Sequence, residues 1–331
     1  MVYHRDAVVY ITNNGSPLLY LITPQVCISV GLMIYKTKVL MICNSCGIDD
    51  IQCFALIYRR FYAIIYQKVG DFVDKKVILI SIDGMRPDGL KICGNPYVNE
   101  LEKLCSYTYN ASSMNPSVTF PCHFSMTHSV TPQRHGILTN TYVPQVRPVT
   151  GIFEKITAAG GVSAMFYGWE PLRDIASPCS LKFATYINAY MQESGDTVLT
   201  NEAEKIICEH KPDFVFLYMV ETDEKGGHDN GWMSEEYLRR ISIAIDNVKR
   251  IIEKFGEEYS VIIMADHGGH ERSHGTDRLE DMTIPLFFYG PDFTPGENIK
   301  NASLLDIAPT IADIMSIGSD PDWEGRSLLR D

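Results

Sequence analysis

The sequence predicts an α/β protein, with a mostly parallel central sheet and helices on both faces. From residue 75 onward, short apolar runs of strand length alternate with segments of helical pattern, the order that builds parallel sheets. Two of these runs, residues 77–83 and 259–266, share one form: a continuous aliphatic stretch that ends on an aspartate. Strands buried on both faces have such continuous runs, so we expect both segments to be central strands.

The other elements follow from local signals. A proline near the start marks helices at 95–104 and 120–130, and Gly160 ends a helix over 148–159. Ser234 caps a long helix whose apolar residues recur every three or four positions. The remaining expected elements are strands at 162–167, 214–220, 259–265 and 284–289, and helices at 201–209 and 304–314.

Residues 1–73 differ from the rest of the chain. They carry apolar runs at 18–35 and 53–66 without clear helix caps or a consistent period. No change of composition divides residues 74–331. We therefore expect a non-catalytic N-terminal extension over 1–73 and one catalytic domain over 74–331.

The extension does not have the pattern of a membrane or export segment. The run at 18–35 has the minimum length of a membrane-spanning helix and is interrupted by Pro24, and the first ten residues lack the basic start of a signal peptide. Membrane association through residues 18–66 is thus an alternative that the sequence disfavours. An alternative start codon at Val69 or Val73 would leave the extension out of the native protein.

Charge and cysteine usage narrow the class of partner. A net charge of −12 disfavours a nucleic-acid polymer, whose binding requires a basic face, but allows a small phosphate ester or nucleotide. The nine cysteines are odd in number and scattered, which indicates reduced thiols and a cytoplasmic protein. Cys43 and Cys46 have CxxC spacing without a second such pair, and are interpreted as unpaired thiols.

Five polar clusters lie along the domain, and together they predict a metal centre. Their carboxylate and imidazole groups are the ligand types of Zn²⁺ or a similar transition metal, whereas Mg²⁺ and Ca²⁺ sites are nearly all oxygen. Six ligands shared by two ions leave coordination positions open for chemistry. The clusters are Asp83, Thr119, Asp223 with His228, Asp266 with His267, and His274.

Thr119 is the candidate nucleophile. It precedes Phe120 and Pro121 at the predicted start of a helix, where free N–H groups and the helix dipole favour a phosphate. A metal ion beside the hydroxyl would lower its pKa. The alternative is that Thr119 only caps the helix.

Residues 77–331 resemble the alkaline phosphatase superfamily, and within it the nucleotide pyrophosphatase/phosphodiesterase family. The resemblance rests on the order of the clusters and on the segments SIDGMRPDG, SVTFPCH, RHGI, DHGGH and LLDIAPTIADIM…GRSLL. It implies two divalent ions, most simply zinc, and a threonine nucleophile. The implied ligands are Asp83, Asp266, His267 and Thr119 for one ion, and Asp223, His228 and His274 for the other.

The same resemblance implies the groups that hold the phosphate and the reaction. Asn140 matches the asparagine that binds a phosphate oxygen, Phe120 would add its N–H, and His135 is interpreted as structural. The implied reaction is hydrolysis of a phosphodiester or nucleotide pyrophosphate through a covalent phospho-threonine. Alternatives are a phosphomonoesterase or phosphonate hydrolase on the same scaffold, and a catalytically inactive binding module. A sulfatase is disfavoured because Thr119 stands where its nucleophile segment would be.

Three departures from the family pattern leave alternatives open. Asp223 stands five residues before His228 instead of four, so Glu224 is the substitute ligand. His270 competes with His274, because the long insertion that normally precedes the last histidine is missing. Cys122 replaces the family's asparagine three residues after the nucleophile.

Overall fold

The computed structural model describes residues 7–13, 16–22, 39–40 and 75–329, and the chain divides into two compact units, residues 1–70 and 71–331. In the first unit, strands β1 (Ala7–Asn13), β2 (Ser16–Ile22) and β3 (Val39–Leu40) form an antiparallel sheet in the order β2-β1-β3.

Most of the sequence features noted in the extension cannot be compared with the structure. β2 takes up residues 18–22 of the apolar run at 18–35. The rest of that run, the run at 53–66, the CxxC pair and both alternative start positions lie outside the described residues. Among the helices that the structure does describe, none combines the length and the hydropathy needed to cross a bilayer.

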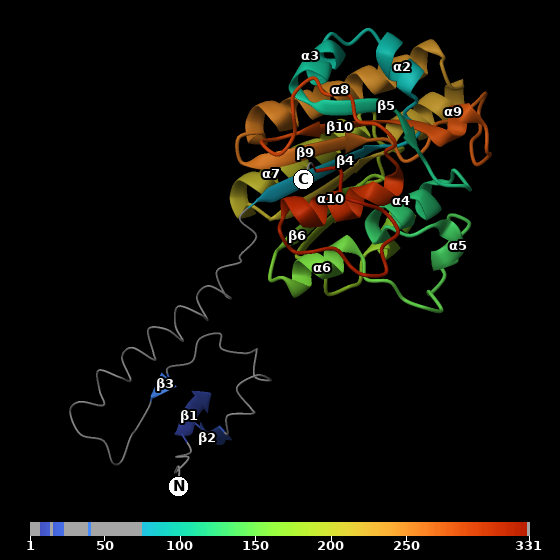
Figure 1. Cartoon of the computed structure of the whole chain (residues 1–331). Coiled ribbons are helices and arrows are strands. Elements are labelled where there is room, and N and C mark those ends of the chain that lie inside the picture. Colours follow the sequence, from blue (N-terminus) through green and yellow to red (C-terminus); the bar gives the residue numbers. More distant parts are fainter. Residues whose placement is uncertain (1–6, 14–15, 23–38, 41–74, 330–331) are drawn as a thin grey trace. The chain divides into compact units, whose positions relative to one another are not determined.

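The second unit is built on a seven-stranded sheet in the order β5-β10-β9-β4-β8-β6-β7 (Figure 1). Only β10 runs antiparallel to its neighbours; the other strands point in one direction. The expected mostly parallel sheet is therefore confirmed. The strands are β4 (Lys76–Ile82), β5 (Ser106–Ser112), β6 (Ser163–Tyr167), β7 (Phe183–Tyr186), β8 (Phe214–Met219), β9 (Tyr259–Met264) and β10 (Thr283–Tyr289).

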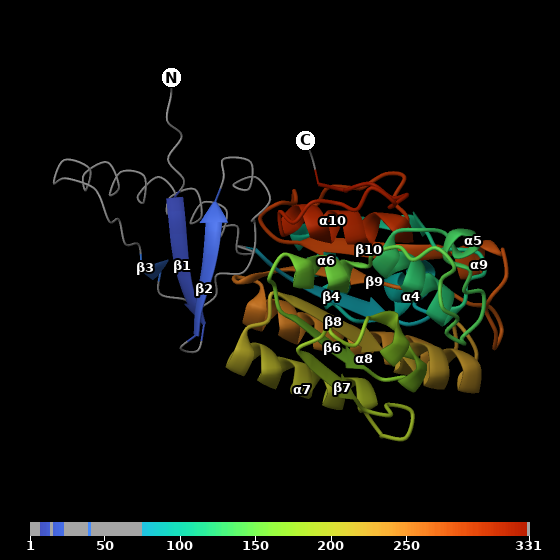
Figure 2. The ribbon, with the colours of Figure 1, turned by 90° about the horizontal axis from the view of Figure 1, so that it is seen from below.

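Helices cover both faces of this sheet, as Figure 2 shows. One layer consists of α4 (Thr119–His128), α6 (Ile152–Ala158) and α10 (Ile307–Ile314). The other consists of α2 (Pro87–Ile92), α3 (Tyr97–Leu104), α7 (Gly195–His210) and α8 (Glu235–Phe255). Short helices α5 (Pro132–His135) and α9 (Leu279–Met282) lie in connections, with 3₁₀ turns at Glu170–Ile175 and Leu304–Asp306.

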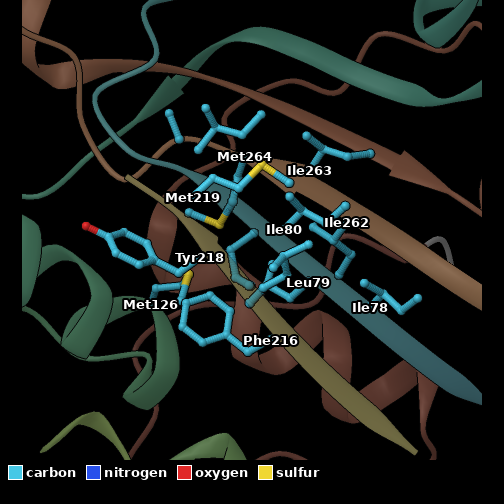
Figure 3. Close-up of a cluster of buried hydrophobic side chains, with 14 of the residues drawn as sticks. Ile78, Leu79, Ile80, Met126, Phe216, Tyr218, Met219, Ile262, Ile263 and Met264 are labelled. Carbon is cyan, nitrogen blue, oxygen red and sulfur yellow. The ribbon is translucent and has the colours of Figure 1, made fainter. Parts of the chain in front are cut away.

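The central strands β4, β8 and β9 form the middle of the core. Their side chains point into both helical layers and are almost all fully buried, as Figure 3 shows for Ile78, Phe216 and Ile262. Burying one such side chain stabilises the fold by about 1.5–3 kcal/mol. Because these strands are parallel and in register, their carboxyl ends meet at one edge of a rigid sheet.

Most element boundaries agree with the prediction, and two differ. The Ser234 cap is confirmed, because its hydroxyl accepts a hydrogen bond from the N–H of Tyr237 at 3.2 Å. However, α6 begins at Ile152 instead of 148, and α7 begins at Gly195 instead of 201. The added turn of α7 is poor in helix formers, and tertiary hydrogen bonds of Asp196, described below, hold it.

Candidate metal and phosphoryl site

Two groups of ligand-type side chains lie at the carboxyl edge of the sheet. Asp83 follows β4, and Asp266 and His267 follow β9; their ligand atoms lie within 4.8 Å of one another. Asp223, His228 and His274 form a second group with the same spread. The structure thus gathers all six predicted carboxylate and imidazole side chains in the two sets expected from the sequence.

The first group is fully buried around one imidazole nitrogen. His267 Nε2 lies 3.3 Å from Asp83 Oδ1, 3.3 Å from Asp266 Oδ2 and 3.2 Å from Thr119 Oγ1. Asp83 Oδ1 and Asp266 Oδ2 have no hydrogen-bond partner. Two carboxylate oxygens that accept no hydrogen bond in a buried position are costly unless a cation lies between them.

A π-helix shapes the second group. Thr222–His228 winds with one extra residue in the turn, so Asp223 and His228, five positions apart, lie on the same face. His228 Nε2 is 3.3 Å from Asp223 Oδ2, and His274 Nε2 is 3.9 Å from Asp223 Oδ1. The five-residue spacing that departed from the family pattern therefore still brings the two side chains together.

Backbone carbonyls fix the orientation of the three imidazoles. The Nδ1–H groups face the carbonyl oxygens of neighbouring loops at 2.7–3.0 Å: His267 to Gly268, His274 to Ser117, and His228 to Arg272. Each ring therefore presents its Nε2 lone pair to the carboxylates. Histidines that bind metals usually donate their other ring N–H in this way. The donor set and its unpaired oxygens thus fit two cations.

The two groups adjoin. The rings of His267 and His274 stack with centroids 4.0 Å apart and an angle of 16° between their planes. Trp232 packs edge-on against His228 and His274 and donates its indole N–H to the carbonyl of Gly84 at 3.0 Å. This aromatic wall limits how the histidines can move.

The pKa values of these groups are shifted because the side chains are buried and lie close to one another. Burial, and then the negative charge of Asp223, raise the pKa of Asp266 to about 7, and burial also raises the pKa of Asp83. Burial and the neighbouring His274 lower the pKa of His267 to about 3. The hydrogen bond to Asp223 raises the pKa of His228 to about 9. Bound cations would relieve the repulsion between the carboxylates and displace the His228 proton.

Thr119 does not act as a cap in this structure. Val118 is the N-cap residue of α4, and no side chain caps the helix. The Thr119 hydroxyl instead lies against His267. The N–H of Phe120 donates to Asn140 Oδ1 at 3.0 Å, which holds the Asn140 amide at the pocket that Thr119 also lines.

The residues that the sequence left open occupy distinct places. Glu224 lines the pocket but belongs to neither ligand group. His270 lies 2.7 Å from Asp281 through its Nδ1, away from both groups. The thiol of Cys122 is buried against the carbonyls of Met114 and Pro116, so it supports the preceding turn. His135 is buried and accepts the N–H of Ile137 at 3.1 Å, consistent with a structural role.

Sequence reasoning missed three side chains at this site. The Tyr218 hydroxyl donates to Asp83 Oδ2, and His123 Nδ1 lies 3.3 Å from Asp266 Oδ2. Trp169 lines the pocket. The single hydroxyl in the otherwise apolar strand β8 could have indicated Tyr218, because a buried hydroxyl needs a partner.

A pair of buried carboxylates anchors the segment that enters the π-helix. Asp196 accepts the N–H groups of Val220 and Glu221 at 2.9 and 3.0 Å, and Glu221 accepts the N–H of Gly195 at 3.0 Å. Lys225 pairs with Glu221 at 2.6 Å. The N-terminus of α7 is thereby fixed to the chain two residues before Asp223.

This anchor predicts a pH-dependent contribution to stability. Burial, and then the charge of Glu221, raise the pKa of Asp196 from 3.8 to about 7. Because the folded pKa lies above the unfolded one, the contribution is full below about pH 4 and is lost as the pH rises through 7. In urea unfolding at matched zinc, the free energy of unfolding of the native protein minus that of Asp196→Asn should fall by a few kcal/mol from pH 4 to 8. A difference independent of pH would contradict the assignment.

The fold and the site together define a class: an α/β protein with two adjoining metal-ligand groups at the carboxyl edge of its sheet. Comparison with known families agrees with this class. The family model described as Metalloenzyme superfamily matches residues 126–319, more than half of the chain. The chain belongs to the Metalloenzyme superfamily, and membership implies a bound divalent metal.

The similar proteins found by sequence comparison carry the names of nucleotide pyrophosphatases or phosphodiesterases. The chain is 25% identical over 257 residues to mouse ectonucleotide pyrophosphatase/phosphodiesterase family member 1, covering 67% of this chain and 28% of that protein. It is 26% identical over 248 residues to venom phosphodiesterase 2 of Crotalus adamanteus, covering 67% and 30%. The chain thus spans less than a third of the length of these relatives.

A solved structure shows the same fold. Murine ectonucleotide pyrophosphatase/phosphodiesterase 5, an inactive variant in complex with AMP, superposes with a TM-score of 0.64 at 15% identity. The match covers 75% of this chain and 96% of that one. The arrangement of sheet and helices is therefore that of the alkaline phosphatase-like proteins.

Proposed function

We propose that the protein hydrolyses phosphodiester or nucleotide pyrophosphate bonds through a covalent phospho-threonine. The observation that carries the proposal is the position of the Thr119 hydroxyl at the start of α4. It lies 3.2 Å from Nε2 of His267, which belongs to the first ligand group together with Asp83 and Asp266. Similarity to named phosphodiesterases supports the same reaction class.

Two divalent ions, most simply zinc, would be held by the two ligand groups. When bound, they would neutralise charge on the phosphate and lower the pKa of a nearby hydroxyl. The mixture of carboxylate and imidazole donors favours zinc over magnesium or calcium. The ligands are Asp83, Asp266 and His267 beside Thr119, and Asp223, His228 and His274.

The proposed reaction is a double displacement in which Thr119 is the nucleophile and Asn140 binds the phosphate. Thr119 Oγ1 gives its proton to solvent and attacks phosphorus in line, so an Oγ1–P bond forms as the P–O bond to the leaving group breaks, and the leaving oxygen takes up a proton from solvent. Water then attacks phosphorus, the Oγ1–P bond breaks, and Thr119 regains a proton. With its Oδ1 held by the N–H of Phe120, the Asn140 amide would donate its N–H to a phosphate oxygen.

The ratio of diester to monoester hydrolysis tests the substrate class. Apart from the two ions, the described pocket lining has no lysine or arginine to pair with the second charge of a monoester, so a diester with its single charge meets less repulsion from the carboxylates that line the pocket. We therefore expect a kcat/KM for bis-(p-nitrophenyl) phosphate at least about tenfold above that for p-nitrophenyl phosphate. A faster monoester would identify a phosphomonoesterase on the same scaffold and overturn the diesterase assignment.

A further inference from the structure

The pocket beside Thr119 contains side chains that neither belong to the ligand groups nor act as the nucleophile. Four of its lining residues belong to neither ligand group and are not the nucleophile: Asn140, Trp169, Tyr218 and Glu224. The Tyr218 hydroxyl donates a hydrogen bond to Asp83, and Asn140 Oδ1 accepts one from the N–H of Phe120. Trp169 and Glu224 are left to face a substituent of the bound ester.

Glu224 holds a carboxylate in this pocket without a lysine or arginine partner, and its positive neighbours are histidines of the second ligand group. It lies half-buried in the π-helix beside Asp223. The next residue, Lys225, turns away and pairs with Glu221 at 2.6 Å and with the carbonyl of Gln192. No lysine or arginine between residues 75 and 329 forms an ion pair with Glu224.

Outside the two ligand groups, the described pocket lining also lacks a cationic side chain that could hold a second phosphate. No lysine or arginine of the described part of the chain lines it. Arg86, close in sequence to Asp83, binds Asp88 and the carbonyl of Gly269 instead. A further phosphate that extends beyond the two ions would therefore meet the Glu224 carboxylate with no lysine or arginine to pair with it, whereas an ammonium there would be attracted by that carboxylate and by the indole of Trp169.

We propose that Glu224 sets the selectivity of this site, favouring phosphodiesters with a positively charged substituent over neutral ones and rejecting those with a further negative charge. The inference rests on the proposed function and narrows its substrate class: diesters with an ammonium group are preferred, and nucleotide pyrophosphates are poor substrates. Glu224 acts on the charge of the substituent and takes no part in bond breaking.

Three aryl diesters test this selectivity, because they share p-nitrophenolate as leaving group and differ in the charge of the second substituent. The substituents are 2-trimethylammonioethyl, its neutral isostere 3,3-dimethylbutyl, and the anionic 2-carboxyethyl. We expect kcat/KM of the zinc-loaded protein to fall about tenfold at each step from cationic to neutral to anionic, mainly through KM. Glu224→Gln should bring the ratio of cationic to neutral ester close to one.

Asp229→Asn is the matched control. Asp229 is an exposed acid just after the π-helix that does not line the pocket, so its removal changes the same net charge without changing the selectivity. If Glu224→Gln keeps the native ratios, or if Asp229→Asn changes them as much, the inference is wrong.

Binding separates failure of the inference from failure of the proposed function. Calorimetry on zinc-loaded Thr119→Ala measures the affinities of the three diesters without turnover. Binding in the order cationic, neutral, anionic without hydrolysis by the native protein would overturn the proposed function and keep the inference. Equal affinities for the three diesters would overturn the inference. Equal hydrolysis of all three esters by the native protein and by Glu224→Gln would also overturn the inference, but the proposed function would then stand.

Discussion

Replacing Thr119 with alanine is expected to lower kcat for bis-(p-nitrophenyl) phosphate by at least about 1,000-fold. The Thr119 hydroxyl is the only group of the protein proposed to form a bond to phosphorus, and no other hydroxyl of the described residues lies against His267. Because the six carboxylate and imidazole ligands remain, the variant should keep the metal content of the native protein. Steady-state kinetics and elemental analysis on the same preparation measure both.

Thr119→Ser is the matched control for this variant. It keeps a hydroxyl at the start of α4 and should retain a large part of the activity, together with a phosphorylated serine trapped on acid quenching. Substantial hydrolysis by Thr119→Ala would rule out the nucleophile role. Loss of both metal content and cooperative unfolding in that variant would show that it reports on folding instead.

Replacing Asp223 with asparagine is expected to remove one ion per chain and to lower kcat/KM by about 100-fold or more. Both oxygens of Asp223 face imidazoles of the second group, at 3.3 Å from His228 and 3.9 Å from His274. An asparagine offers only one oxygen and no charge, so His228 and His274 would be left without a carboxylate partner. Elemental analysis after dialysis against metal-free buffer measures the loss.

Glu224→Gln is the comparison that decides between the two acidic residues. Glu224 lies outside both ligand groups, so this variant should keep both ions. If Glu224→Gln loses an ion and Asp223→Asn does not, the ligand assignment of the second group is reversed.

The sheet and the six candidate ligands at its edge could be predicted because they follow from strong local signals. The apolar strands β4 and β9 lead directly into Asp83 and Asp266, and parallel strands bring their carboxyl ends to one edge whatever the loops between them do. The predicted side chains of the second group lie on connections after β8 and β9, the same edge.

Other features could not be predicted because they depend on tertiary contacts. The π-helix at Thr222–His228 has no signature in residue propensities, so the choice between Asp223 and Glu224 stayed open until the turn was seen. The position of His270 also depends on a tertiary contact, because its ring hydrogen-bonds to the buried carboxylate of Asp281, eleven residues later. Tyr218 has the pattern of a core residue, and only its neighbour Asp83 reveals the use of its hydroxyl.

The beginning of α7 illustrates how long-range hydrogen bonds override local propensity. The segment GDTVLT contains glycine and β-branched residues, which favour an ordinary loop. In the folded protein Asp196 bonds to the backbone after β8, and the helix extends to Gly195 to make that contact. Sequence reasoning about one segment has no access to a partner that lies more than twenty residues away.

Metal content coupled to diester hydrolysis tests the central claim most directly. We predict about two zinc ions per chain by elemental analysis, loss of bis-(p-nitrophenyl) phosphate hydrolysis on chelation, and recovery of activity as two equivalents of zinc are added back. Hydrolysis that persists in fully chelated protein, or a chain that binds no divalent metal at micromolar concentration, would contradict the account.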